Sequence, residues 1–166
     1  MHPRAASLIE WLGMTRHPEG GFYRETFRSR ETVVPGGRVV ERSALTTIYF
    51  LPVGGGFSRW HRVLADEAWH FYEGDPLELR WAPDDGSRVV QATLGPIADP
   101  VVAAPTTPVQ VVPAGWWQTA RTTGAYTLVG CTVGPGFDFA DFQMLADDPA
   151  AARRVTARCP GSDAWL

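Results

Sequence analysis

The chain has 166 residues, of which 45% are hydrophobic and 20% charged, as expected for one globular domain that can bury its own core. A formal net charge of −3 argues against nucleic-acid binding, and the absence of lysine excludes Schiff-base enzymes and P-loop phosphate sites. No apolar run is long enough to span a membrane, and the N-terminal residues lack the apolar core of a signal peptide. We therefore expect a cytoplasmic protein without nucleic-acid or membrane partners.

The first half of the chain predicts a short helix followed by strands. Apolar residues recur at helical spacing over 5–12, and Gly13 provides a stop. The turn-rich segment 17–21, His-Pro-Glu-Gly-Gly, leads into residues 22–28, where aromatic and polar residues alternate as in a strand. Residues 43–51 are β-branched and apolar, which predicts a buried central strand.

Residues 55–74 contain two candidate functional side chains, His61 and Glu67. Strands are predicted over 57–63 and 68–72, joined by a polar turn at 64–66. Because side chains alternate between the two faces of a strand, His61 and Glu67 are both expected to face the interior. A histidine and a carboxylate in one interior can bind a metal or act as an acid–base pair, and a buried structural hydrogen bond is the alternative.

The second half continues with short strands, predicted at 76–81, 88–94, 109–112, 116–122 and 125–133. The sequence Gly134-Pro135-Gly136 is expected to end the β region, and a terminal helix is predicted over 149–158. Many short strands between Gly and Pro turns, with helices only at the ends, indicate an all-β jelly-roll barrel. Ligands of such barrels bind in the mouth or lumen.

The chain resembles the cupin superfamily. Four residues stand at the spacing of the first cupin motif, namely Gly55, His61, Glu67 and Gly74. The second motif is similar to PAGWWQ at 113–118. Segments such as HPEGGFYRETFRS, HRVLADEAWHFYEGDPLEL and PGFDFADF are similar to a group of small single-domain cupins classed as a domain of unknown function. The resemblance implies one cupin jelly-roll domain (a double-stranded β-helix) over 1–166, with its core at about 17–136.

The same resemblance implies a metal site that this sequence alters. Metal-binding cupins typically use two histidines and a glutamate from the first motif and a histidine from the second. Here Val63 and Gln118 stand at two of the histidine positions. The remaining donors are His61, Glu67 and the amide oxygen of Gln118, so a divalent metal is expected to bind weakly if at all. The alternative is that these three side chains form a hydrogen-bonded polar cluster.

Several aromatic and polar residues are further candidates for ligand binding. Trp69, Phe71 and Trp116 can line a pocket wall, although aromatic side chains also simply fill barrels. Tyr23 and Arg24 follow the 17–21 turn, in wording similar to the first strand of dTDP-sugar epimerases, which are metal-free relatives with the same RmlC-like barrel.

The face of the second hairpin strand opposite Glu67 is expected to lie outside the barrel. It carries His70 and Tyr72, and an apolar strand face of this kind is better covered than exposed to water. Cupins often pair through their sheets, so the resemblance implies a homodimer.

These residues predict a small-molecule enzyme with His61 and Glu67 as general base and acid and with Gln118 orienting the substrate. A site poor in metal ligands suits an isomerase- or epimerase-like reaction on a polar, sugar-like compound. Two alternatives stay open. One is a non-catalytic cupin that binds a small ligand, and the other is a weak-metal enzyme such as a dioxygenase.

Overall fold

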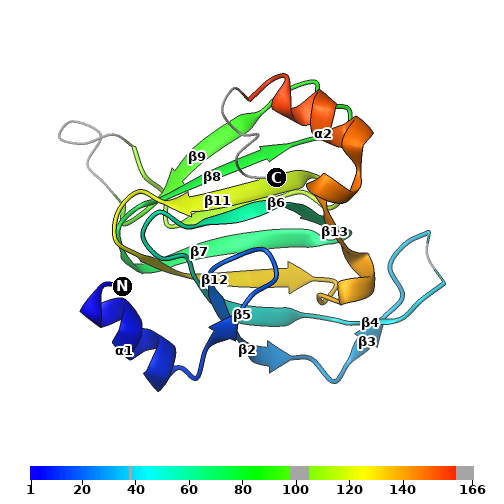
Figure 1. Ribbon diagram of the computed structural model, residues 1–166. Coiled ribbons are helices and arrows are strands. Elements are labelled where there is room, and N and C mark those ends of the chain that lie inside the picture. The colour runs from blue at the N-terminus through cyan, green and yellow to red at the C-terminus, as the bar shows by residue number, and fades with distance from the viewer. Residues whose placement is uncertain (38, 98–104, 160–166) are drawn as a thin grey trace.

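Two antiparallel sheets face each other in the computed structural model, which describes residues 1–37, 39–97 and 105–159 (Figure 1). The six-stranded sheet has the order β1 (Thr15–Arg16), β2 (Phe22–Arg28), β5 (Thr46–Leu51), β12 (Thr127–Gly134), β7 (Asp66–Gly74) and β10 (Val109–Val112). The five-stranded sheet has the order β13 (Phe142–Met144), β6 (Phe57–Val63), β11 (Trp117–Thr122), β8 (Leu77–Ala82) and β9 (Val90–Leu94). A short hairpin pairs β3 (Thr32–Val33) with β4 (Arg42–Ser43).

The all-β cupin jelly roll predicted from the sequence is confirmed. Strands β2, β6 and β10 begin and end at the predicted residues. In the part of the chain that the structure describes, two α-helices lie toward the ends, α1 at Pro3–Trp11 and α2 at Pro149–Thr156. Among the described residues, no helix is both long and apolar enough to cross a membrane.

One sequence prediction about the end of the β region is wrong. After the Gly134–Gly136 turn come a 3-10 helix, η1 (Phe139–Asp141), the strand β13 and a second 3-10 helix, η2 (Leu145–Asp147). Strand β13 pairs with β6, with Phe142 opposite Val63 and Met144 opposite His61. Without this pairing β6 would leave an edge of unpaired backbone groups, which folded proteins generally cover. The barrel strands therefore extend past the expected limit at residue 136.

The main hydrophobic core fills the space between the two sheets. Both sheets contribute to it in equal number: Phe50, Trp69, Val112, Val129 and Cys131 from one sheet, and Leu77, Leu79, Trp81, Leu94 and Ala120 from the other. All ten side chains are buried. Because the inward residues of each strand alternate with outward ones, this core also fixes which residues of β6 and β7 face the barrel interior.

Helix α2 covers the outer face of the five-stranded sheet. Trp60 and Trp117 project from that face and pack with Leu145, Ala151 and Val155. Trp60 therefore points away from the interior that its neighbour in sequence, His61, occupies. The indole of Trp60 is fully buried, so this contact holds β6 firmly against the helical end of the chain.

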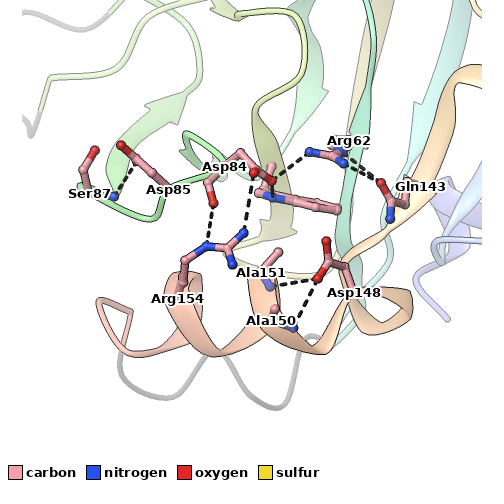
Figure 2. A network of polar contacts seen from close by, with 10 residues as sticks. Arg62, Asp84, Asp85, Ser87, Gln143, Asp148, Ala150, Ala151 and Arg154 are labelled. Carbon is pink, nitrogen blue, oxygen red and sulfur yellow. Dashed lines mark hydrogen bonds and ion pairs between the residues drawn. The ribbon is translucent and has the colours of Figure 1, made fainter.

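A polar network attaches α2 to the sheet at Asp84 (Figure 2). The Asp84 Oδ1 atom accepts a hydrogen bond from Arg62 Nη1 at 2.8 Å, and the Asp84 backbone carbonyl accepts one from Arg154 Nε at 3.1 Å. Asp148 caps the helix by accepting hydrogen bonds from the amides of Ala150 and Ala151. These contacts hold β6 at the position from which His61 enters the barrel.

Candidate functional site

The segment 17–21 forms a turn that is pinned onto β6. The Glu19 carbonyl accepts a hydrogen bond from the Arg59 backbone amide at 2.8 Å, and the Pro18 carbonyl accepts one from the Arg59 guanidinium at 2.6 Å. Gly20 has φ of 118°, and a Cβ there would lie 2.5 Å from the Phe57 carbonyl oxygen. Only glycine fits this close approach. The turn thereby delivers the Glu19 side chain into the barrel.

Glu19 is buried next to two histidines. Its side-chain Oε2 lies 3.1 Å from His61 Nε2 and 3.5 Å from His17 Nδ1, and the residue is 5% exposed. Burial disfavours the charged carboxylate and raises the pKa of Glu19 to about 7, while His17 and a hydrogen bond with Ser58 act in the opposite direction. The Glu19 carboxyl group therefore gains and loses its proton near neutral pH.

His61 is held in one orientation by the backbone of its own strand. Its Nδ1 lies 2.7 Å from the Arg59 carbonyl oxygen, which can only accept a hydrogen bond, so Nδ1 carries the proton. In the neutral ring Nε2 is then an acceptor, and Nε2 is the atom that faces Glu19. Burial lowers the pKa of His61, against the attraction of Glu67, and so favours this neutral form.

Gln118 connects His61 to Glu67. The Trp69 indole Nε1 donates to Gln118 Oε1 at 3.0 Å, and since an indole nitrogen can only donate, this contact fixes which way the amide points. The amide nitrogen of Gln118 consequently donates to Glu67 Oε2 and lies 3.2 Å from His61 Nε2. Gln118 is completely buried, so it positions the other two side chains without being exposed to the cavity.

Glu67 is the second buried carboxyl group of the site. Burial raises its pKa, against the attraction of His61 and the hydrogen bonds that it receives from Gln118 and from the Cys131 thiol. The pKa of the Cys131 thiol is in turn raised well above its usual range, first by burial and then by the neighbouring carboxyl groups. Cys131 is therefore a neutral hydrogen-bond donor to Glu67.

These groups stand at the base of a cavity of about 460 Å³, within the size range of small-molecule sites. Its polar lining includes His17, Glu19, Glu25, Arg28, His61 and Glu67. Its aromatic lining consists of Tyr23, Phe137, Phe139 and Phe142. The Phe142 ring stacks on His61 with centroids 5.4 Å apart and an interplanar angle of 26°.

The structure brings together the three residues that the cupin motifs single out. His61, Glu67 and Gln118 converge as the sequence predicts, and Tyr23 lines the cavity beside them. Within the described chain, the other expected ligand-binding residues lie outside this cavity. Trp69 is buried in the core behind Gln118, and Arg24 lies on β2 beside a smaller surface pocket.

Phe71 and Trp116 are likewise placed by packing. Both are partly buried against the core between the sheets, and the Arg88 guanidinium lies 5.3 Å above the Trp116 ring. Aromatic side chains of this barrel thus act mainly as filling at these two positions. Their role in ligand binding stays a prediction.

Sequence reasoning missed Glu19, Cys131 and Phe142, which come from a turn, from β12 and from β13. Glu19 gave a usable signal, since an acidic residue in a turn beside a histidine is a recognisable pattern, but no periodicity states where a turn points. The contribution of Cys131 to Glu67 has no signal of its own, because a small thiol in an apolar run is indistinguishable from a core residue. The apolar spacing around Phe142 gives no hint that its ring stacks on His61.

A barrel of two antiparallel sheets with a polar cluster in its lumen defines a cupin. Residues 6–145 match the family model described as Cupin superfamily (DUF985), and the chain belongs to this family. Protein SO0799 from Shewanella oneidensis is 33% identical over 92% of both chains, with a TM-score of 0.76. A hypothetical protein from Leishmania major is 29% identical over 90% of this chain and 97% of its own, with a TM-score of 0.75.

More distant structures share the fold alone. Oxalate decarboxylase from Bacillus subtilis is 14% identical, with a TM-score of 0.56, and the match covers 80% of this chain and 30% of the decarboxylase. No curated protein matches the sequence.

The cupin resemblance implies a metal, and the donor atoms of this cluster decide whether one fits. The Gln118 oxygen, which would be the ligand atom, accepts a hydrogen bond from Trp69, and the amide N–H groups face His61 and Glu67 instead. Hydrogen-bond donors at that position repel a cation. Among the described residues, no group of three or more His, Cys, Asp and Glu side chains has an arrangement that could hold a metal ion. In this arrangement the Gln118 amide does not fit as a metal ligand.

Proposed function

We propose that this cupin is a small-molecule enzyme that moves protons on a polar substrate, in an isomerase- or epimerase-like reaction. The observation that carries the proposal is the 3.1 Å contact between Glu19 Oε2 and His61 Nε2 at the base of a 460 Å³ cavity. Burial raises the pKa of the carboxyl group and lowers that of the imidazole. The protonated and ionised forms of Glu19 are therefore close in free energy near neutral pH, while His61 is kept in its neutral form, which can accept a proton.

Each residue then has a defined task. His61 lines the cavity with Nε2 unprotonated, and once a substrate displaces one of its present contacts, Nε2 accepts a proton from a carbon–hydrogen bond that a neighbouring carbonyl acidifies. Glu19 or Glu67, each with a raised pKa, returns a proton to the substrate. Gln118 is a positioning residue rather than a substrate contact, because it is buried and holds His61 and Glu67 in place. One bond to hydrogen breaks and another forms, so the reaction needs neither oxidant nor water.

Deuterium exchange tests the proposal even where the product is unidentified. The full chain is incubated in D2O with ketoses, aldoses and amino sugars, and NMR follows deuterium entering the carbon beside the carbonyl. We expect exchange with at least one compound and a loss of about 100-fold or more in His61→Asn, the usual magnitude for a general base. The control Tyr72→Phe changes a half-exposed residue outside the cavity and should exchange at the wild-type rate.

The main alternative is a non-catalytic cupin that binds a small ligand in the same cavity. It is favoured by the contacts of Gln118, which give both His61 and Glu67 a hydrogen-bond partner in the absence of any substrate. A compound that binds to the wild type but shows no exchange above the buffer rate would support this alternative. Exchange that persists unchanged in His61→Asn would rule out His61 as the base.

A further inference from the structure

The charges that line the cavity are unequal. Carboxyl groups come from four residues, namely Glu19, Glu25, Glu67 and Asp138. Among the described lining residues, the single arginine is Arg28. Its Nε and Nη2 atoms donate to the two carboxylate oxygens of Glu25 at 3.1 and 2.7 Å, and its Nη1 donates to the Phe137 carbonyl at 3.0 Å. The guanidinium charge is thus neutralised by a bidentate partner of its own.

Three phenylalanines form a corner at the same cavity. The rings of Phe137, Phe139 and Phe142 have centroids 5.0 to 6.1 Å apart, and their planes meet at 68° to 80°. Phe139 is 55% exposed and lines the cavity, so part of its ring is open to a ligand. Edge-to-face contacts leave part of each ring face open, and all three rings line the cavity, so a cation can approach an aromatic face there.

Carboxylates flank this corner. Asp138 lies between two of the phenylalanines in the chain and caps η1 by accepting a hydrogen bond from the Ala140 amide through Oδ1 at 2.8 Å. Glu25 is joined to the Phe137 backbone through Arg28. Because Glu25 is neutralised by its own pair with Arg28, the attraction for a cation comes from Asp138 and the aromatic π-electrons, and an anion would be repelled by both.

We propose that the cavity binds ligands that carry an ammonium group, with the cation against the rings of Phe137, Phe139 and Phe142 and beside Asp138. The uncharged part of the ligand then extends toward His61. This inference deepens the proposed function by naming its substrate class, a cationic amine with polar groups. It rests on the proposed function only for the statement that the ligand is also a substrate.

Matched probes of one size and three charges test the binding step directly. Choline carries a quaternary ammonium, 3,3-dimethylbutan-1-ol has the same shape without charge, and 3,3-dimethylbutanoate is an anion. Calorimetry or NMR titration on the full chain measures their dissociation constants. We expect choline to bind about tenfold tighter than the alcohol, and the carboxylate to bind most weakly.

Two variants separate the ring face and the charge from simple apolar contact. Phe139→Leu keeps an apolar side chain but removes a π face, and Asp138→Asn keeps a capping side chain but removes a charge. Each should weaken choline severalfold and leave the alcohol unchanged. Phe27→Leu is the matched control, because Phe27 is 51% exposed and lies outside the described cavity lining.

The outcomes decide the proposal whether or not the protein is an enzyme. Equal binding of the three probes, stronger binding of the carboxylate, no choline binding at millimolar concentration, or an equal loss for choline and the alcohol in Phe139→Leu would each overturn it. If choline binds selectively and no amine shows deuterium exchange, the proposed reaction fails while the ammonium site stands.

Discussion

Replacing Glu19 by glutamine removes an ionisable group while keeping the shape of the side chain beside His61. In the wild type the pKa of this carboxyl group rises from its ordinary value of 4.5 to about 7 because the group is buried. One pKa unit corresponds to about 1.4 kcal/mol. At a pH where the carboxyl group is ionised in both the folded and the unfolded chain, this shift therefore lowers the free energy of unfolding by about 3 kcal/mol. Glutamine carries no such penalty at any pH.

The sign follows from the two pKa values. Below about pH 4.5 the carboxyl group is protonated in the folded and the unfolded chain, and its full contribution to stability is present. As the pH rises through about 7, the unfolded chain is already ionised and the folded chain resists ionisation, so stability is lost. His17 and His61, whose pKa values are lowered by burial, act in the opposite sense and lose stability as the pH falls below 6.5. Both histidines are retained in the variant.

Urea denaturation of the wild type and of Glu19→Gln measures this difference. Between about pH 5 and pH 8 the free energy of unfolding of the variant should rise relative to that of the wild type by about 2.5 kcal/mol. Glu10→Gln, at an exposed position in α1, is the control and should show no such trend. If the free energies of unfolding of Glu19→Gln and the wild type differ by the same amount at every pH in this range, the pKa of Glu19 is not raised by burial.

Three further predictions concern metal, core and assembly. The double change Val63→His with Gln118→His rebuilds a three-histidine, one-glutamate donor set, so the variant should retain a divalent metal through dialysis that the wild type does not; stoichiometric metal in the chelated wild type would contradict this. Trp69→Phe leaves the buried Gln118 oxygen without its donor and should lower the free energy of unfolding by about 1–3 kcal/mol in urea titrations, and a loss below about 0.5 would show that the bond is unimportant. The half-exposed Tyr72 lies on the outer face of β7, which we expect to form a homodimer interface, so sedimentation should give a dimer that Tyr72→Arg dissociates, and a wild-type monomer of 18.2 kDa would rule it out.

Alternation along strands is the part of this fold that the sequence encodes locally. The positions of His61 and Glu67 in the interior follow from a period of two, and the sheet register then brings Gln118 opposite His61. The first residues of β2 and β6 could be predicted because a glycine turn precedes each of these strands. The resemblance to cupin motifs supplied the third member of the cluster.

The sequence did not predict the buried position of Glu19 or the strand β13, and the two have different physical reasons. The direction of the Glu19 side chain is set by backbone contacts of its turn with Arg59 and by the close approach of Gly20 to β6, which are long-range interactions with no local pattern. Residues 139–145 have apolar side chains three apart, a spacing compatible with a helical turn, and the free edge of β6 determines that a strand forms.

Proton transfer and ligand recognition, which enzymes often combine in one segment, are expected to depend on different segments of this chain. The residues that hold protons, Glu19, His61 and Glu67, come from the N-terminal turn and from β6 and β7. The aromatic corner belongs to the short stretch 137–144 that follows the barrel's last long strand (Figure 1). Changes at Phe137 and Phe139, which precede the strand that pairs with β6, would therefore alter which compound is held without displacing the groups that act on it. Related chains with different residues there would be expected to share one chemistry and differ in their ligands.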